Sequence, residues 1–433
     1  MNRVVREPGL FWPALWRLAL AGACFVGIYT TCNRYTASRT DVSVWMWEWE
    51  RHMPFIPELV VPYWSLDLFF CGAFFLCSSR VELNLLTKRI IAVTLASGIC
   101  YLLIPLRMGL DRPVPSGWTA PLFHALYLND LPHNLAPSLH ISLRSLVWVF
   151  YGAHLTGWWR RLTKAWFILI GASTVLVWQH HLIDVASGFV MGWIIAAAIP
   201  DPRQRPASRT PSPKLACRYS MGALLFGFLA LEWLGFAWPA VALGIMALAY
   251  ATGLSRLLGK ENGTLSPGAE WCLLPVLLGA RWIQRKWLQS QPAWHEVTPG
   301  VLFGRRLTKA EAARLVAGGP LAVLDLTAEN NALTVFREHT FYHNIPLLDL
   351  VLPAAPDIAA AVDFIRRVPA GHRVFIHCQL GLQRSATVAA HWLVASGTAT
   401  DLPAAFCQIQ ELNPDVVLHP AAAAGTCVEN KTS

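Results

Sequence analysis

Residues 373–394 read Arg-Val-Phe-Ile-His-Cys-Gln-Leu-Gly-Leu-Gln-Arg-Ser-Ala-Thr-Val-Ala-Ala-His-Trp-Leu-Val. The apolar start of this stretch, which ends at His377, predicts a buried strand, and the run from Ser385 onward predicts a helix. A loop that joins a strand to a helix N-terminus points its backbone N–H groups inward and forms an anion site. The stretch therefore predicts a strand–loop–helix unit whose loop, residues 378–384, binds an anion.

Two side chains of the same loop fit a phosphate group and a nucleophile. Arg384 offers a planar pair of N–H donors that matches two phosphate oxygens. The positive field of the loop favours the thiolate form of Cys378, which is the form that attacks. Few arrangements other than phosphoryl transfer through a cysteinyl-phosphate need all of these parts at once.

The pattern His-Cys-x-x-Gly-x-x-Arg-Ser resembles the signature of the cysteine-dependent protein tyrosine phosphatase superfamily, over roughly residues 295–425. A span of this length suits the smaller dual-specificity branch. The resemblance implies that Cys378 is the nucleophile, that Arg384 binds phosphate, and that Ser385 helps the thiolate leave in the second step. It also implies that the variable positions of the loop contact the substrate: Gln379, Leu380, Gly381, Leu382 and Gln383.

In that family an Asp on an upstream loop protonates the leaving oxygen. Ile345-Pro-Leu-Leu-Asp349 ends about 29 residues before Cys378, so Asp349 is the expected general acid. Asp357 and Asp363 are the alternatives, but Asp363 lies in a helical pattern, where a solvated helix face is the simpler interpretation. A lone free Cys more often packs in a core, but the full set of residues favours catalysis.

The remainder of the chain is more apolar than a soluble enzyme, since 55% of its 433 residues are hydrophobic and only 14% are charged. Apolar runs of about the length that crosses a bilayer explain this composition. The expected spans are roughly 11–31, 58–77, 90–106, 138–155, 165–181, 183–200, 219–237 and 239–257. Residues 270–283 are apolar but short, which favours an interfacial helix followed by a basic tether.

Lys and Arg residues set the expected orientation of these spans. They fill the N-terminal head and alternate loops, namely those with Arg80, Lys88 and Arg89, with Arg160, Arg161 and Lys164, and with Arg203 to Arg218. Basic loops face the cytoplasm, so the catalytic domain is expected there and the loop 107–137 in the periplasm of a bacterium. The net charge of +9 follows from this topology and does not indicate nucleic-acid binding.

A second group of ionisable residues lies among the spans. Pro137-Ser138-Leu139-His140 opens one span, and Ser173, His180 and Asp184 follow with the spacing Ser-x6-His-x3-Asp. Ionisable groups at membrane edges are costly and indicate a functional site by default. A His held by an Asp is a good nucleophile toward phosphorus, a second His can protonate the leaving group, and Arg residues bind phosphate oxygens.

These motifs resemble the type 2 phosphatidic acid phosphatase superfamily over roughly residues 55–200. The resemblance implies that His180 is the nucleophile, Asp184 its orienting partner and His140 the general acid. It also implies phosphate binding by three arginines: Arg107, Arg112 and Arg144.

The second group departs from the commonest form of that family at two positions. Leu139 stands where Gly is usual, and Thr174 stands where an Arg would bind phosphate. The altered motif is more similar to the inositol phosphorylceramide synthase and sphingomyelin synthase branch, which transfers head groups between lipids. A lipid phosphatase, a head-group transferase and an inactive scaffold that anchors the catalytic domain therefore all remain open.

The expected fold is a polytopic α-helical membrane domain followed by a cytoplasmic α/β domain with a central, mainly parallel sheet. Its parts are residues 1–54 with the first span and outer loop, 55–200 with the phosphatidic acid phosphatase-like domain, 201–257 with a further transmembrane hairpin, 258–294 with an interfacial segment and linker, and 295–433 with the dual-specificity phosphatase domain. Early elements of the last part are expected as strands at 301–303 and 322–326 and a helix at 308–316.

The substrate is constrained by charge and by location. The variable loop positions carry no positive charge, which disfavours a highly phosphorylated inositide. A membrane-tethered site favours a lipid phosphomonoester such as phosphatidylglycerophosphate or a phosphoinositol-type lipid, and a phosphoprotein is the alternative. We expect no metal and no cofactor, because Arg and backbone N–H groups supply the positive field that Mg²⁺ supplies elsewhere.

Overall fold

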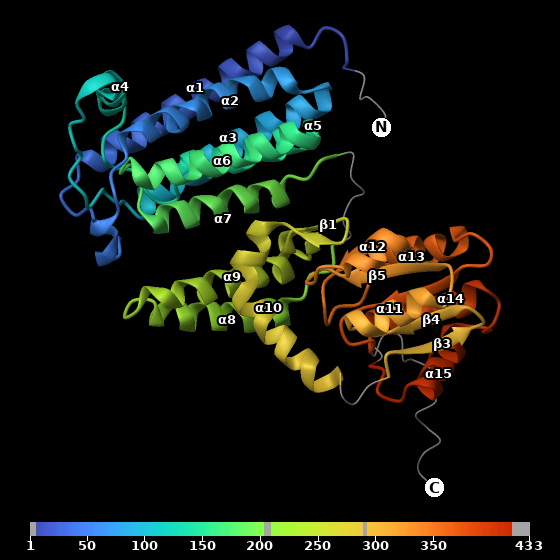
Figure 1. Ribbon diagram of the computed structural model, residues 1–433. Helices are drawn as coiled ribbons and strands as arrows, with labels where there is room; N and C mark the ends of the chain where they lie inside the picture. Colours follow the sequence, from blue (N-terminus) through green and yellow to red (C-terminus); the bar gives the residue numbers. More distant parts are fainter. Residues whose placement is uncertain (1–5, 203–208, 289–291, 418–433) are drawn as a thin grey trace. The chain divides into compact units, whose positions relative to one another are not determined.

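The computed structural model describes residues 6–202, 209–288 and 292–417 and divides into two units, Met1–Arg205 and Pro206–Ser433 (Figure 1). The first unit is built from α-helices. Their bounds are α1 Phe11–Ala37, α2 Val60–Leu76, α3 Arg80–Leu103, α4 Ala120–Asn129, α5 Leu139–His154, α6 Gly157–Leu176 and α7 Leu182–Ala198.

Each expected span is helical over most of its length, but several boundaries were wrong, and two of these errors concern basic residues. Helix α3 begins ten residues before the expected 90, because Ser79 caps it by accepting a hydrogen bond from the backbone N–H of Glu82 at 3.2 Å. Helix α6 begins at Gly157 instead of 165. The basic residues that were assigned to two loops therefore lie in helices. Arg80, Lys88 and Arg89 belong to α3, and Arg160, Arg161 and Lys164 belong to α6. Helix α4, within the loop 107–137, was not expected.

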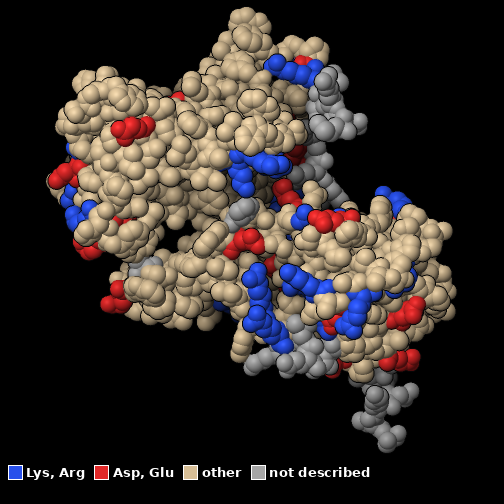
Figure 2. Space-filling view, in the orientation of Figure 1, with Lys and Arg blue, Asp and Glu red and all other residues tan. Residues whose placement is uncertain are grey.

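Among the residues that the structure describes, three helical segments are long and apolar enough to cross a membrane, namely Phe11–Ala37, Pro57–Leu76 and Arg80–Leu103. This statement rests on length and composition alone. Helices α7 and α9 are apolar but shorter. Figure 2 shows large areas over the helices without Lys, Arg, Asp or Glu, which is the surface that lipid-facing helices would carry.

Helices α5 and α7 approach closely because small residues face each other. A Cβ atom added at Gly188 would lie 2.4 Å from the carbonyl oxygen of Ser138, and one added at Gly192 would lie 2.9 Å from that of Ser142. Small residues permit such contact between helices in a membrane. The backbone N–H of Ser138 also donates to the carbonyl oxygen of Asp184 at 3.0 Å. The starts of α5 and α7 are therefore joined.

The second unit opens with helices α8 Pro213–Leu229 and α9 Ala237–Thr252, which pack against each other within the residues expected to form a transmembrane hairpin. A short β-hairpin follows, with β1 Lys260–Glu261 and β2 Thr264–Leu265. Helix α10, Pro267–Leu288, is longer than the apolar run expected at 270–283.

The rest of this unit consists of a five-stranded sheet, in the order β3-β4-β7-β5-β6, and the helices that cover it. Only β3 and β4 are antiparallel, so the mainly parallel sheet is confirmed. The strands are β3 Trp294–Thr298, β4 Val301–Gly304, β5 Leu321–Thr327, β6 Phe341–Leu347 and β7 Arg373–His377. The helices are α11 Lys309–Ala317, α12 Thr334–His339, α13 Ala355–Arg367, α14 Arg384–Ala395 and α15 Leu402–Leu412.

Helices cover both faces of this sheet, because alternate strand residues join different cores. Phe303 and Ile376 pack with residues of α13, α14 and α15. Leu302 and Phe375 pack with residues of α11 and α12. The fully buried central strands place the loop after β7 at the carboxyl edge of the sheet, where ligands bind in α/β folds.

Candidate active site

The loop between β7 and α14 surrounds the sulfur atom of Cys378, whose residue is 3% exposed. The backbone N–H of Gly381 donates to Sγ at 3.3 Å, and the Ser385 hydroxyl lies 3.4 Å from the same sulfur. The strand–loop–helix arrangement expected from the sequence is confirmed. The Gly381 N–H stabilises negative charge on sulfur, as a nucleophilic thiolate requires. The Ser385 hydroxyl also donates to the carbonyl oxygen of Gly304 at 3.2 Å.

Gly381 holds a conformation that a side chain would disturb. Its φ is +79°, and a Cβ atom there would lie 2.8 Å from the backbone N of Arg305 and from the backbone C of Gly304. Residues with a Cβ rarely adopt such a φ. The third position of the loop is therefore restricted to glycine by conformation and by space.

Arg384 is 0% exposed, and four groups fix its guanidinium, the first being the carbonyl oxygen of Leu326 at 3.3 Å. It donates to both carboxylate oxygens of Glu329, at 3.0 and 2.7 Å. It also donates to the carbonyl oxygen of Leu347 at 2.9 Å and pairs with Asp349 at 2.9 Å. Its Nε is buried and has no hydrogen-bond partner among the described residues. That N–H is thus the donor left for a phosphate oxygen.

Asp349 lies directly beside this arginine, on the turn after β6. Burial raises the pKa of the Asp349 carboxyl, and this effect and the charge of Glu329 outweigh the opposing charge of Arg384. A carboxyl that keeps its proton to higher pH suits a general acid. Among the alternatives, Asp363 is exposed on α13, while Asp357 is buried in the first turn of that helix.

Glu329 was not anticipated from the sequence. Burial would raise the pKa of its carboxyl, but the Arg384 guanidinium holds that pKa below its usual range. Glu329 follows β5, which is the neighbour of β7 in the sheet. The carboxyl ends of parallel strands lie at one edge, so the strand order was the signal that could have found it.

A buried ion pair lies behind the loop. The Lys260 ammonium group donates to Asp325 Oδ2 at 2.7 Å and to Thr327 Oγ1 at 2.7 Å. The Tyr342 hydroxyl donates to the same carboxylate at 2.7 Å, and His377 Nε2 lies 3.9 Å from it. Burial would raise the pKa of Asp325, but Lys260 and His377 hold it well below its usual range. Lys260 comes from the β1–β2 hairpin, outside residues 295–433.

The variable loop positions differ in what their side chains contact. The amide group of Gln379 donates to Gln284 of α10 at 3.0 Å and accepts from Asn330 at 2.5 Å. Its side chain therefore links α10 to the loop. Leu382 and Gly381 are buried, whereas Leu380 and Gln383 are partly exposed.

The second group of residues lies in the first unit, at the joined starts of α5 and α7. His180 Nδ1 lies 3.6 Å from Asp184 Oδ2, and Asp184 is 0% exposed. His140 stacks on the ring of Tyr63, with ring centres 4.2 Å apart. His140 Nε2, His180 Nδ1 and Asp184 Oδ1 are buried without a hydrogen-bond partner among the described residues. Unpaired polar atoms of this kind are typical of a ligand site.

The three arginines assigned to this group have different surroundings. Arg112 donates to the carbonyl oxygen of Asp130 and, at 3.2 Å, to Gln179, the neighbour of His180. Arg144 donates to the carbonyl oxygen of Phe167 at 2.6 Å. The backbone N–H of Arg107 donates to the carbonyl oxygen of Ser43 at 3.0 Å.

Thr174 stands in the turn that precedes His180. Its carbonyl oxygen accepts the backbone N–H groups of Gln179 and His180, both at 3.0 Å. Its hydroxyl donates to Gly171 at 2.8 Å. Thr174 therefore shapes the turn, and its short side chain carries no charge for a phosphate.

His181 is held by a buried glutamate that the sequence did not reveal. Its Nδ1 lies 3.5 Å from Glu50, and its Nε2 accepts the N–H of Gly109 at 3.1 Å. Glu50 also accepts the N–H of Leu182 at 3.0 Å. His181 thus packs two loops against the start of α7.

Known proteins match the C-terminal part of the chain. Residues 314–421 match the family described as dual specificity phosphatase, catalytic domain. An Arabidopsis thaliana protein named phosphatidylglycerophosphate phosphatase PTPMT2 is 30% identical over 183 residues, which cover 39% of this chain and 79% of that protein. Dual specificity protein phosphatase 1 of Homo sapiens is 34% identical over 104 residues, which cover 23% and 27%.

Solved structures are also similar to this part. The one described as the crystal structure of Tk-PTP in the active form is 22% identical, with a TM-score of 0.28, and the match covers 30% of this chain and 91% of that one. Asp349, Cys378 and Arg384 all lie within the residues that the family match covers.

Proposed function

Because the chain belongs to the dual-specificity phosphatase family and is a phosphoric monoester hydrolase of that type, we propose that it hydrolyses a lipid phosphomonoester through a cysteinyl-phosphate. The observation that carries the proposal is the meeting of Cys378, Arg384 and Asp349 in a chain with long apolar helices. The relative's name, phosphatidylglycerophosphate phosphatase, agrees with such a substrate. Phosphatidylglycerophosphate and a phosphoinositol-type lipid are the candidates.

The reaction proceeds in two displacements at phosphorus. The Cys378 thiolate attacks and forms the S–P bond, while Asp349 gives its proton to the departing lipid oxygen as the P–O bond breaks. Arg384 Nε and the loop N–H groups hold the phosphoryl oxygens. Water then attacks with Asp349 as base, and Ser385 donates to the sulfur as it leaves, which releases inorganic phosphate.

The setting of this site is the cytoplasmic face of a bacterial inner membrane. The long apolar helices supply the anchor, and the loop 107–137 lies on the periplasmic side. The variable positions of the loop after Cys378 carry no charged side chain, which favours a phosphomonoester of modest charge.

A panel of substrates tests the proposal with the full chain in micelles. Phosphate release from phosphatidylglycerophosphate, a phosphoinositide and phosphotyrosine peptides is measured for wild type, Cys378→Ser and His180→Ala. We expect lipid to be preferred, Cys378→Ser to lose most of the phosphate release, and His180→Ala to keep most of it. Preference for the peptides would favour a phosphoprotein phosphatase, and full activity of Cys378→Ser would move the chemistry to His180.

We further propose that the first unit carries a His-based site for lipid phosphate, as a phosphatase or a head-group transferase. The supporting observation is the buried His180–Asp184 pair beside ring nitrogens that have no partner among the described residues. Exchange of labelled head group between lipids by Cys378→Ser, and its loss in His180→Ala, is the expected result for a transferase. No exchange and no phosphate release by Cys378→Ser would leave the first unit as an anchor.

A further inference from the structure

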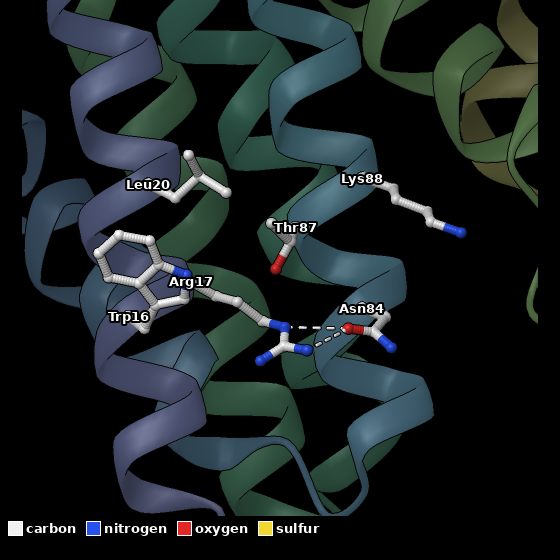
Figure 3. Close-up of a pocket in the computed structure, with 6 residues that line it drawn as sticks. All are labelled: Trp16, Arg17, Leu20, Asn84, Thr87 and Lys88. Atoms are coloured by element: carbon white, nitrogen blue, oxygen red, sulfur yellow. Dashed lines mark hydrogen bonds between the residues drawn. The ribbon is translucent and has the colours of Figure 1, made fainter.

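A pocket of about 280 Å³ opens between the N-terminal halves of α1 and α3, and its lining shares no residue with either site described above (Figure 3). Its lining is Trp16, Arg17, Leu20, Asn84, Thr87 and Lys88. Figure 3 shows the Arg17 side chain crossing from α1 to Asn84 on α3, with Lys88 on the same helix. The pocket thus combines two cationic side chains with an apolar wall.

The cationic groups of this pocket have no acidic partner. Arg17 donates through Nε and Nη2 to the Asn84 amide oxygen at 2.9 and 2.7 Å, and through Nη1 to the carbonyl oxygen of Pro13 at 3.3 Å. These acceptors are neutral, so they orient the guanidinium without cancelling its charge. Within residues 6–202, 209–288 and 292–417, no carboxylate lies within ion-pair distance of Arg17 or Lys88.

Both cations sit at a similar depth along their helices. The helices start at the same end, because the backbone N–H of Glu7 donates to Ser78 at 2.9 Å and its carboxylate accepts from Arg80 at 3.0 Å. Arg17 follows the start of α1 by six residues and Lys88 follows the start of α3 by eight. At the rise of an α-helix these are depths of about 9 and 12 Å.

Such depths lie near the boundary between head groups and acyl chains, if the two helices cross a membrane as proposed. Long basic side chains extend to that boundary. Trp12 is 74% exposed and Trp16 is 68% exposed on the same turns of α1, and Trp gathers at this level of a bilayer. Leu15 and Leu20 are exposed beside them, which continues the apolar wall toward the surrounding lipid.

We propose that this pocket binds the head group of an anionic phospholipid. The phosphate contacts Arg17 and Lys88, and an acyl chain runs along Leu20 and Trp16. Basic pockets between transmembrane helices on the cytoplasmic side commonly hold anionic lipids. The apolar wall distinguishes this ligand from free phosphate, which would need no such surface. The proposal rests on the membrane part of the proposed function, and it does not depend on Cys378 chemistry.

The test titrates the purified full chain in detergent with dioleoylphosphatidylglycerol or dioleoylphosphatidylcholine, followed by native mass spectrometry. We expect one tightly held phosphatidylglycerol and weaker phosphatidylcholine. The Arg17→Gln/Lys88→Gln variant should bind phosphatidylglycerol about 30-fold more weakly, because each cation near a membrane surface contributes about 1 kcal/mol and each 1.4 kcal/mol is tenfold. The matched control, Arg160→Gln/Arg161→Gln, removes the same charge from exposed positions of α6.

Three outcomes would overturn the proposal. They are equal affinity for the two lipids, an equal loss in the control, and displacement of the lipid by millimolar inorganic phosphate. Lys88→Gln alone, at an exposed position with no hydrogen bond to Asn84, tests the site if the double variant does not fold. Hydrolysis of p-nitrophenyl phosphate is measured in parallel, so that a failed lipid site and a failed phosphatase are told apart.

Discussion

At the scale of single residues, the proposed general acid Asp349 predicts how the rate of the reaction depends on pH. Burial raises the pKa of its carboxyl, so the acid stays protonated to higher pH than an exposed Asp and is lost as pH rises through that pKa. Asp349→Asn should lower kcat on alkyl phosphates by about 10²- to 10⁴-fold and remove this high-pH fall. Rates measured across pH check the prediction.

The control for this variant is Asp363→Asn, at an exposed position of α13, which should leave kcat unchanged. An unchanged high-pH fall in Asp349→Asn would assign the acid to another residue.

Gly381 offers a second prediction at this scale. Gly381→Ala should lower kcat/KM at least tenfold, because the new methyl group would press on the backbone of Gly304 and Arg305 at 2.8 Å and distort the loop. The matched control is Gly397→Ala, where φ is +75° but a Cβ would meet nothing within 4 Å. That variant should lose about 1 to 2 kcal/mol of stability and keep its activity. Equal kinetics in the two variants would contradict the account.

Cys378, Arg384 and Ser385 were predictable because they fall in one short motif. Glu329 was not, since 55 positions separate it from Arg384 and only the strand order brings them together. Glu50 and Lys260 are also far in sequence from their partners. Each is a lone charged residue outside the long helices, and such residues are usually solvated, so nothing in the sequence indicated that they belong to a buried pair. A sequence read locally therefore finds the proposed nucleophile and the proposed general acid, and misses the distant glutamate that holds the arginine.

At the scale of elements, the β1–β2 hairpin forms a sheet of its own, and the Lys260 side chain connects it to Asp325 and Thr327 of β5. Lys260→Met would leave the buried Asp325 carboxylate without its cation, and breaking a buried pair costs about 3 to 5 kcal/mol. We expect a lower midpoint of thermal inactivation, measured on the full chain with p-nitrophenyl phosphate. Lys309→Met, at an exposed position of α11, is the control and should not change the midpoint.

The same pair gives an acid dependence of stability. The pKa of Asp325 is depressed in the folded chain, so its contribution is present at neutral pH and is lost as pH falls below about 4. Lys260→Met should weaken this dependence. If Lys260→Met were as stable as wild type at neutral pH, the Lys260–Asp325 pair would not contribute to the stability of the sheet.

The predicted element boundaries agree with the structure where the apolar periodicity is clear. They disagree where polar residues extend a helix beyond its apolar run. The strand at 373–377 and the helix after it lie where expected. The starts of α3 and α6 were predicted too late in the chain, because the first turns of both helices carry charges and an apolar window excludes them. Strand β3 escaped prediction because it is a half-buried edge strand with little apolar alternation.

At the scale of the whole molecule, the distribution of Lys and Arg predicts which side of the membrane each segment occupies. Reporter fusions after residue 115 should give a periplasmic signal, and fusions after residues 206 and 260 a cytoplasmic one, because basic helix ends stay in the cytoplasm. Alkaline phosphatase and green fluorescent protein reporters measure this. A periplasmic signal after residue 260 would place Cys378 in the periplasm.

The surroundings of Arg384 have a consequence for the enzyme in a cell that contains free phosphate. The Glu329 carboxylate already pairs with this guanidinium, so an orthophosphate dianion meets the repulsion of that carboxylate as well as the attraction of the loop. We expect weak product inhibition, and Glu329→Gln should lower the inhibition constant of orthophosphate several-fold by removing one charge. An unchanged constant would contradict this. Such shielding would keep the loop vacant at physiological phosphate concentrations, ready for a substrate that brings additional binding energy from its alcohol part.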